Sequence, residues 1–301
     1  MSLLVTGTVG IDTVETPHGT ANDVLGGSAC YFSLAASLLT PVRLVCVVGE
    51  DFPEKFRNLF ANRPIDLAGM ETRAGSKTFR WHGRYVGDMN HAETLRTDLN
   101  VVAEAPPKIP EAFRDTGYVF LANTHPAIQR RFIEQLRSPK LIVCDTMNLW
   151  INEFRDDLVK TLSAVDGVVL NDGEARLLTG QTDLIRAGLD VIKMGPTFVV
   201  IKKGEHGAML VSPDEVFVLP AFPTANVKDP TGAGDSFAAG MMGHLAAIDR
   251  IDAGAMKGAM ARGACMASIT IESFSLDSIL AAKRETLDAR LTKYKQMLSF
   301  D

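Results

Sequence analysis

The most chemically suggestive segment of the sequence is residues 229–240, which read DPTGAGDSFAAG. A glycine-containing turn runs directly into an apolar, alanine-rich stretch that is typical of a buried helix. The first turn of a helix has unpaired backbone N–H groups and a partial positive charge, and glycines let an anion approach that backbone closely. One carboxylate, Asp235, stands at the junction, where a site built only to hold an anion would not place negative charge. An anion cradle next to a base indicates phosphoryl transfer to a hydroxyl group.

Taken alone, the same residues also fit a tight turn with Asp235 as a helix N-cap. The longer string Asp-Pro-Thr-Gly-Ala-Gly-Asp, however, resembles the C-terminal signature of the PfkB, or ribokinase-like, family of sugar and nucleoside kinases. The resemblance implies that Asp235 is the general base toward the attacking hydroxyl, and that Gly232, Ala233 and Gly234 form the anion hole for the transferring phosphoryl group. Because a helix N-terminus favours negative charge, we expect Asp235 to stay ionised and to take the proton late.

A second motif, Asn-Asp-Gly-Glu at residues 171–174, follows a strand-like apolar run. By itself it is a good helix start, with Asn171 as the N-cap and Glu174 closing a capping box. It also resembles the Asn-x-x-Glu motif of the PfkB family and lies upstream of the first motif, as in that family. The resemblance implies that Asn171 and Glu174 place Mg²⁺ and the nucleotide phosphates. Since Mg²⁺ keeps several of its waters, Glu174 would act through water.

A third motif, Lys-Lys-Gly-Glu-His-Gly at residues 202–207, follows the next strand-like run. The pattern alone is typical of a plain hairpin turn. In the PfkB family a Gly-x-x-Gly turn at this place approaches the nucleotide, so the resemblance implies that Lys202, Gly204 and Gly207 belong to the ATP site. By the same analogy, Asp229 and Thr231 would help to hold a monovalent cation such as K⁺.

The site for the phosphoryl acceptor is expected near the N-terminus, where residues 7–12 (GTVGID) follow the first strand and Gly26 and Gly27 open a helix. These segments resemble the acceptor site of the family, which implies that Asp12 binds substrate hydroxyls and that the two glycines allow close backbone approach. A carboxylate suits a polyol because it can accept two hydrogen bonds. The chain departs from the family at Tyr31, where the family usually has Asn, so an aromatic face replaces an amide in the predicted acceptor site.

Two further polar residues end strand-like runs. Asn123 follows residues 118–122, where ribokinase-like enzymes often place a polar substrate contact, and Asp145 follows residues 141–144. Ligands of open α/β sheets gather at the carboxyl ends of the strands, so both side chains would lie where a site forms. Either residue could instead cap a helix.

The elements that must position these residues follow an alternation of strand and helix patterns. Apolar runs typical of buried strands occupy residues 3–6, 42–48, 118–122, 141–144, 167–170 and 198–201. Segments with a helical period occupy residues 28–39, 53–62, 126–137 and 152–163. From Ser236 onward the pattern is nearly all helical. The alternation predicts an α/β fold with a doubly wound, mostly parallel sheet and helices on both faces, and the family resemblance implies the ribokinase-like version of it.

Two stretches break the alternation and predict a small β-sheet lid. Residues 12–24 are polar around a turn, and residues 66–100 contain strand-like alternation. The sequence therefore predicts two parts. The α/β kinase core consists of residues 1–11, 25–65 and 101–301, and the β lid consists of residues 12–24 and 66–100. A lid favours transfer to the acceptor because closure excludes competing water.

One strand of the predicted lid has two different faces. Within residues 77–85, Phe79, Trp81 and Tyr85 would share one side, and the basic residues Arg80, His82 and Arg84 the other. The basic face could simply meet water. The aromatic face could cover the site or make the contact of a homodimer, and the sequence leaves these alternatives open.

Composition limits the class of protein. The chain of 301 residues is 46% hydrophobic and can bury a large core, while its net charge of −5 argues against a nucleic-acid partner. No apolar run is long enough to span a membrane. The N-terminus lacks the basic region of a signal peptide and the four cysteines form no C-x-x-C pair, which indicates a cytoplasmic protein with reduced thiols. Zinc spacing, a P-loop and a dinucleotide fingerprint are likewise missing from the sequence.

The sequence thus predicts an ATP- and Mg²⁺-dependent kinase that transfers the γ-phosphoryl group to a hydroxymethyl group of a sugar such as ribose or fructose. A nucleoside acceptor is the alternative, because Tyr31, Phe32 and the aromatic residues of the lid could stack a base. A non-catalytic sensor of sugars or nucleotides would be expected to lack the base or the anion turn, whereas Asp235, Gly232 and Gly234 are all intact.

Overall fold

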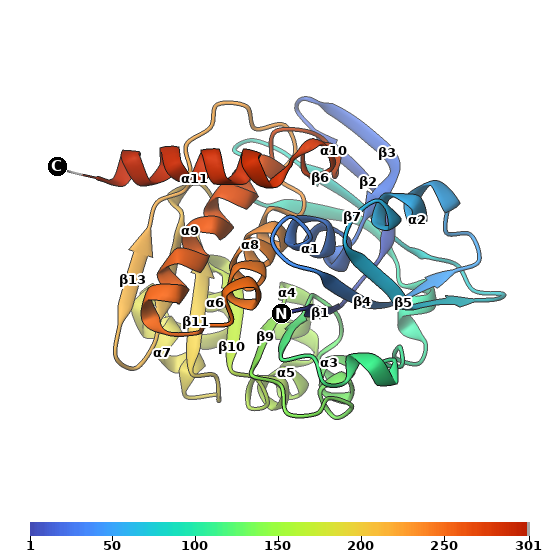
Figure 1. Ribbon diagram of the computed structural model, residues 1–301, viewed down its shortest axis with the longest axis horizontal. Coiled ribbons are helices and arrows are strands. Elements are labelled where there is room, and N and C mark those ends of the chain that lie inside the picture. Colours follow the sequence, from blue (N-terminus) through green and yellow to red (C-terminus); the bar gives the residue numbers. More distant parts are fainter. Residues whose placement is uncertain (300–301) are drawn as a thin grey trace.

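The computed structural model of the protein describes residues 1–299 and contains two β-sheets (Figure 1). The large sheet has nine strands in the order β13-β12-β11-β10-β9-β8-β1-β4-β5. Its strands are β1 (Leu3–Thr6), β4 (Val42–Gly49), β5 (Ile65–Arg73), β8 (Tyr118–Leu121), β9 (Leu141–Asp145), β10 (Gly167–Asn171), β11 (Phe198–Lys202), β12 (Ala208–Val211) and β13 (Val216–Leu219). All neighbours from β5 to β11 are parallel, whereas β12 and β13 are antiparallel. The predicted α/β fold is confirmed.

Helices cover both faces of the large sheet. The helices against one face are α1 (Ser28–Ala36), α2 (Glu54–Ala61), α8 (Ala233–Ile248), α9 (Ala253–Thr270), α10 (Asp277–Ala281) and α11 (Arg284–Leu298). Those against the other face are α3 (Pro126–Ile133), α4 (Asn148–Glu153), α5 (Arg155–Leu162), α6 (Asp172–Thr179) and α7 (Leu184–Ile192). Short 3₁₀ turns are η1 (Asn100–Ala103), η2 (Glu111–Phe113) and η3 (Gly204–His206). Within β1, Leu3 and Val5 join one hydrophobic core and Leu4 the other, because successive side chains of a strand point to opposite faces.

The order of the strands reverses at β1. The chain first adds β4 and β5 on one side of β1, then returns to place β8 on its other side and continues outward to β13. In open α/β sheets such a reversal marks the place where ligands bind, outside the carboxyl ends of the strands. The segments after β1 and β8, which contain Gly7 and Asn123, therefore lie beside each other at this point.

The second sheet has four strands in the order β3-β2-β6-β7, with bounds β2 (Gly10–Thr16), β3 (Gly19–Gly26), β6 (Phe79–Tyr85) and β7 (Ala92–Asp98). Its strands come from the two stretches predicted to form the lid. The predicted boundaries differ in two places. Residues 10–11 and 25–26, assigned to the core, belong to β2 and β3. Residues 66–73, assigned to the lid, belong to β5 and pair with β4 at the edge of the large sheet. An edge strand with one exposed face alternates like a lid strand, which is why the sequence pattern misled us. The division into two domains stays a prediction.

The basic face of β6 is neutralised within the lid. Arg84 Nε donates to Glu15 Oε2 at 2.7 Å, His82 Nε2 lies 2.8 Å from Glu15 Oε1, and Arg80 Nη1 donates to Asp23 Oδ1 at 2.7 Å. The parallel register with β2 places Asp12 beside Trp81, so Asp12 shares the aromatic side of β6.

Smaller differences concern the helices. The predicted helix at residues 152–163 is divided into α4 and α5 at Phe154, whose backbone leaves the helical region at φ −134° and ψ 37°. Among residues 1–299, we find no helix that has the length and apolar character needed to cross a membrane.

Candidate active site

The turn before α8 requires glycine at its first position. Gly232 is the N-cap of α8 with φ +74°, and a Cβ at this position would overlap the ring of Tyr31. Ala233 N donates to Pro230 O at 3.1 Å and Ser236 N to Gly232 O at 2.9 Å. Within the described residues the N–H groups of Gly234 and Asp235 have no carbonyl partner. This is the unpaired helix start on which the predicted anion hole depends.

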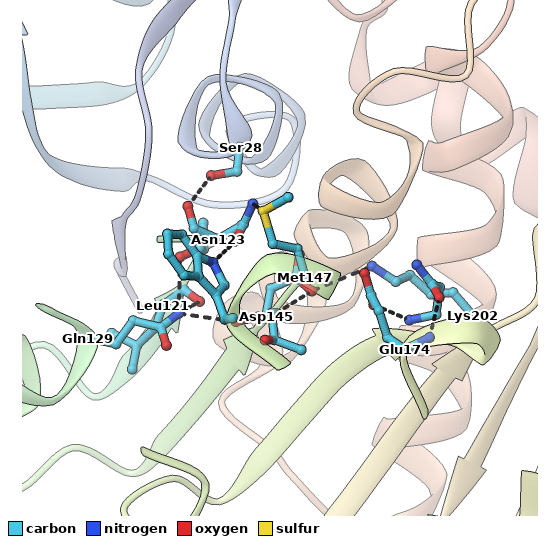
Figure 2. Close-up of polar contacts among 12 residues, drawn as sticks. Ser28, Leu121, Asn123, Gln129, Asp145, Met147, Glu174 and Lys202 are labelled. Atoms are coloured by element: carbon cyan, nitrogen blue, oxygen red, sulfur yellow. Dashed lines mark hydrogen bonds and ion pairs between the residues drawn. The ribbon is translucent and has the colours of Figure 1, made fainter. Parts of the chain in front are cut away.

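Three neighbouring strands of the large sheet bring charged groups to the same helix start (Figure 2). Asp145 is the last residue of β9, Lys202 is the last residue of β11, and Glu174 lies in the first turn of α6, which follows β10. Lys202 Nζ is 3.7 Å from Asp145 Oδ1, and a Cβ on Gly234 would lie 2.7 Å from Lys202 Nζ. The strand-end residues therefore converge on the first turn of α8.

The direction of the pKa shift of Asp235 differs from our expectation. Burial, followed by the nearby Asp145 carboxylate, raises the pKa of Asp235 well above its ordinary range, although Lys202 opposes the shift. Burial thus opposes the helix N-terminus, which we expected to favour the ionised form, and the ionisation of Asp235 stays a prediction. A carboxylate with a raised pKa is a stronger base once it is ionised, which suits proton removal from an alcohol.

The Asn-x-x-Glu motif forms the capping box that its sequence also allowed. Asn171 Oδ1 accepts from Glu174 N at 2.8 Å, and Glu174 Oε2 accepts from Asn171 N at 2.7 Å. Burial raises the pKa of Glu174 to about 7, while Lys202 lowers it. Glu174 Oε1 is left without a hydrogen-bond donor in the described part of the chain.

Residues 1–299 contain no cluster of three or more His, Cys, Asp or Glu side chains arranged to hold a metal ion. That arrangement fits a Mg²⁺ ion that arrives with a nucleotide, because such an ion takes one or two carboxylates and fills its shell with phosphates and water. Glu174 has an oxygen available for this, since the capping box uses only its Oε2.

The acceptor end of the site is built around Asp12, which is only 3% exposed. Its Oδ2 accepts from Gly27 N at 3.2 Å, whereas its buried Oδ1 has no partner. A Cβ at Gly26 would overlap the Asp12 carboxylate, so the glycine pair makes room for it. Burial raises the pKa of Asp12 to about 7; the Gly27 N–H opposes this, and Asp229 adds to it. A buried oxygen without a donor indicates a missing ligand, and a substrate hydroxyl would satisfy it.

Tyr31 is 1% exposed, with its ring against Gly232. Its hydroxyl is close to Ser275 but outside hydrogen-bond geometry, and burial strongly raises the pKa of Tyr31. Phe32 is stacked on Phe120 in the core, with centroids 4.2 Å apart. Neither ring offers a free face to a base in this structure, and direct contact of Tyr31 with the acceptor stays a prediction.

Asn123 is occupied by protein contacts (Figure 2). Its Oδ1 accepts from Trp150 Nε1 at 2.7 Å, its Nδ2 donates to Met147 Sδ at 3.1 Å, and its backbone oxygen accepts from Ser28 Oγ at 3.2 Å. The amide is therefore held in a fixed orientation beside the acceptor region. Its contact with substrate also stays a prediction.

Asp229 ties the turn to a distant loop. Its Oδ1 accepts from Thr231 N and its Oδ2 from Ser275 N, both at 2.9 Å. The buried Oγ1 of Thr231 has no partner. Tyr85, predicted to lie on the aromatic face of the lid strand, brings its hydroxyl near Thr231 without reaching hydrogen-bond geometry. Thus the lid extends over the turn that precedes α8.

The nucleotide loop also meets the lid. Gly204 has φ +53°, and a Cβ there would lie 2.8 Å from Oδ1 of Asn90 in the β6–β7 connection. Gly207 has φ +86°, and its Cβ would collide with the backbone at Leu219, so this glycine is required by packing against the end of β13. The lid consequently spans the site from Asp12 to η3.

Comparison with known proteins identifies the family. The sequence matches the pfkB family carbohydrate kinases over residues 5–282. The chain belongs to this family. Members are ATP-dependent phosphotransferases that use Mg²⁺, and the protein is accordingly a kinase, as the sequence predicted.

Individual relatives differ in how much of this PfkB kinase they match. The cytidine kinase of Thermococcus kodakarensis is 30% identical over 80% of the chain and 87% of its own length. A nucleoside kinase of Methanothermobacter thermautotrophicus is 29% identical over 72% of the chain and 70% of its own length. A fructokinase of Klebsiella pneumoniae is 33% identical, but over only 33% of either chain.

Solved structures confirm the ribokinase-like fold. The complex of aminoimidazole riboside kinase from Salmonella enterica with aminoimidazole riboside and an ATP analogue superposes with a TM-score of 0.80. The superposition covers 97% of this chain and all of that one, at 17% sequence identity. At this identity the likeness concerns the fold alone.

Proposed function

We propose that the protein transfers the γ-phosphoryl group of ATP to the hydroxymethyl group of a nucleoside. The observation that carries the proposed transfer to a hydroxymethyl group is the pair of carboxylates in the site: Asp12, buried with Oδ1 unpaired, and Asp235, at the open start of α8. One can accept hydrogen bonds from the ribose hydroxyls and the other can accept a proton from the attacking hydroxymethyl group.

The length of the resemblance favours a nucleoside over a free sugar. The relatives that match most of the chain at about 30% identity phosphorylate nucleosides, whereas the fructokinase match covers a third of it. The sequence predicted a sugar with a nucleoside as the alternative, and our proposal adopts the alternative. Both acceptors present a hydroxymethyl group and ring hydroxyls, so the roles of Asp12 and Asp235 are the same for either.

In the proposed reaction, Asp235 accepts the hydroxymethyl proton as the acceptor oxygen forms its bond to phosphorus and the bond to the bridging oxygen breaks. The N–H groups of Gly234 and Asp235 stabilise the negative charge on the transferring group. ATP would supply the phosphoryl group, and the accompanying Mg²⁺ would offset part of its negative charge. Asn171 and Glu174 would hold Mg²⁺ through water, and the loop with Lys202, Gly204 and Gly207 would line the nucleotide.

We further propose three properties that rest on the family and on particular contacts. The unpaired Oγ1 of Thr231 beside Asp229 would contribute to a K⁺ site, which activity measured with and without KCl at constant ionic strength tests. Exposed apolar residues on the lid, Val86 and Leu95, would support a homodimer, which light scattering tests. The third property is the cytoplasmic location predicted from the sequence, which fractionation of the host cells tests.

The test is ADP release from Mg-ATP with pyrimidine and purine nucleosides, ribose and fructose as acceptors. We expect turnover with a nucleoside, and a loss on the order of 10²–10⁴ in kcat for Asp235→Asn, because a general base is removed. Asp277→Asn is the matched control, since Asp277 also lies in the first turn of a helix but is exposed. Faster turnover of ribose or fructose than of every nucleoside would refute the nucleoside assignment. Unchanged kcat in Asp235→Asn would refute the role of the base.

A further inference from the structure

Lys202 places an ammonium group where a helix makes positive charge unfavourable. Its Nζ lies against the first turn of α8, so near Gly234 that a Cβ on that residue would be 2.7 Å away. The start of a helix carries partial positive charge, and a cation there is repelled unless anions offset it. The lack of a side chain at Gly234 is what leaves room for the ammonium.

The carboxylates around Lys202 do not use up its hydrogen bonds. The side chain is 17% exposed, and the Asp145 oxygen that pairs with it is 3.7 Å away. That distance exceeds the roughly 2.7–2.9 Å of a charge-assisted hydrogen bond. In the described part of the chain no acceptor lies within hydrogen-bond distance of Nζ, although an ammonium has three N–H donors. Nζ is not fully buried, so water can accept from it in the free protein, and a ligand that displaces this water must supply the acceptors instead.

The charge of Lys202 is nevertheless secured. Burial lowers its pKa, but Asp145 and then Glu174 outweigh burial, so the pKa of Lys202 lies above its ordinary value. Asp145 is held in turn by Thr146 N, which donates to its Oδ1 at 2.9 Å. Lys202 is thus a donor group fixed at the end of β11, beside Glu174 and Asp145 (Figure 2) and against the backbone of Gly234.

We propose that Lys202 is a catalytic residue that donates hydrogen bonds to the oxygens of the transferring phosphoryl group, and that Asp145 is its positioning residue. The proposal rests on the proposed function and deepens it. The acceptor oxygen bonds to phosphorus, the bridging oxygen leaves with ADP, and the hydroxyl proton moves to Asp235. Lys202 remains protonated throughout and stabilises the charge that is spread over the phosphoryl oxygens.

The alternative is that Lys202 only neutralises Asp145 and so maintains the fold. Removing the lysine alone would leave a buried carboxylate unpaired, which by itself is strongly destabilising. The double variant Lys202→Met/Asp145→Asn removes both charges together and so separates the two roles. If Lys202 is structural, the double variant regains both stability and activity. If Lys202 is catalytic, it regains stability only.

The experiment compares the wild type, Lys202→Met, Lys202→Arg, the double variant and a control, Lys193→Met. The control removes an exposed lysine whose Nζ is 2.7 Å from Asp190. The first readout is kcat and the KM of the nucleoside. We expect the two variants with methionine at position 202 to lose on the order of 10²–10³ in kcat, as when one donor to a transition-state oxyanion is removed, with little change in KM. Lys202→Arg should recover part of this loss because the charge is kept.

The second readout needs no acceptor: the affinity for Mg-ADP, measured by calorimetry with and without aluminium fluoride, which imitates the transferring phosphoryl group. We expect aluminium fluoride to tighten Mg-ADP binding in the wild type and in Lys193→Met, and to have a much smaller effect in the double variant. Equal tightening in the double variant, or a wild-type kcat in it, would overturn the proposal. If no nucleoside is phosphorylated, the proposed substrate is wrong. The binding of Mg-ADP with aluminium fluoride still tests the role of Lys202, because it needs no acceptor.

Discussion

Replacing Asp12 with asparagine is expected to stabilise the free protein at neutral pH while removing its activity. Asp12 is buried with an unpaired Oδ1, and burial raises its pKa from the ordinary 3.8 to about 7. Between these values the unfolded chain has released the proton that the folded chain still holds. Because the folded state then binds more protons, its stability falls as the pH rises from about 4 to about 7 and stays low above that.

The size of the effect follows from the two pKa values. At 1.36 kcal/mol per pKa unit, the difference between 3.8 and about 7 corresponds to about 4 kcal/mol of stability lost at pH 8 relative to acid pH. Asparagine keeps an oxygen that can accept from Gly27 N, and it carries no charge to desolvate. The stability gained by Asp12→Asn should therefore grow by about 3 kcal/mol between pH 4.5 and pH 8.

The assay is equilibrium unfolding in urea at pH 4.5, 6 and 8 for the wild type, Asp12→Asn and the control Asp23→Asn. The control removes an exposed carboxylate of the same sheet, the partner of Arg80. Only the difference between each variant and the wild type is compared across pH, so the titration of other carboxylates cancels. A difference for Asp12→Asn that stays constant from pH 4.5 to pH 8 would refute the reasoning. Kinase activity should be lost at all three pH values because the acceptor hydroxyls lose their carboxylate.

Two further predictions concern stability. Gly232→Ala and Gly75→Ala both place a side chain at a positive φ, +74° and +75°, but a Cβ at position 75 meets nothing within 4 Å, whereas one at position 232 overlaps the Tyr31 ring. Both variants should lose about 1–2 kcal/mol of stability to backbone strain, and Gly232→Ala should lose more because its methyl group also meets the Tyr31 ring. Thermal unfolding measures both losses, and equal losses would exclude a role for Tyr31. Arg63 donates to three carbonyl oxygens at the end of α10. Arg63→Met should therefore lower the stability measured by urea unfolding by about 2 kcal/mol and leave kcat unchanged. A loss of kcat would contradict a purely structural role.

The residues that end strands could be placed from the sequence because neighbouring parallel strands end at the same edge of the sheet. Asn171 and Lys202 were each assigned to the end of an apolar run, and they lie opposite each other in the register of β10 and β11. Once neighbouring strands are parallel, their last residues share one edge, and motifs far apart in sequence form one site. The capping box of Asn171 and Glu174 was readable for a different reason, since it involves only residues three apart.

The features that the sequence could not reveal depend on contacts between distant segments. The helix start beside Asp235 is a local feature and suggested an ionised carboxylate. Burial and Asp145, which lies far away in sequence at the end of β9, shift the pKa of Asp235 in the opposite direction. Tyr31 was recognised as a departure from the family, yet its place against Gly232 follows from the packing of α1 on α8. Edge strand β5 was assigned to the lid because alternation shows that one face is exposed and does not show which sheet the strand joins.

The buried carboxylates that lower the stability of the free protein are those that the proposed reaction uses. Burial raises the pKa of Asp12, Asp145 and Asp235 alike, and Lys202 is the ammonium that faces this group from the sheet. A site with this surplus of buried acid groups is poorly satisfied on its own, and a protein selected for stability alone would not retain it. Substrate hydroxyls would donate hydrogen bonds to the unpaired Oδ1 of Asp12, and the proton of the attacking hydroxyl would move to Asp235. The instability of the free site and its capacity for phosphoryl transfer therefore have the same physical origin.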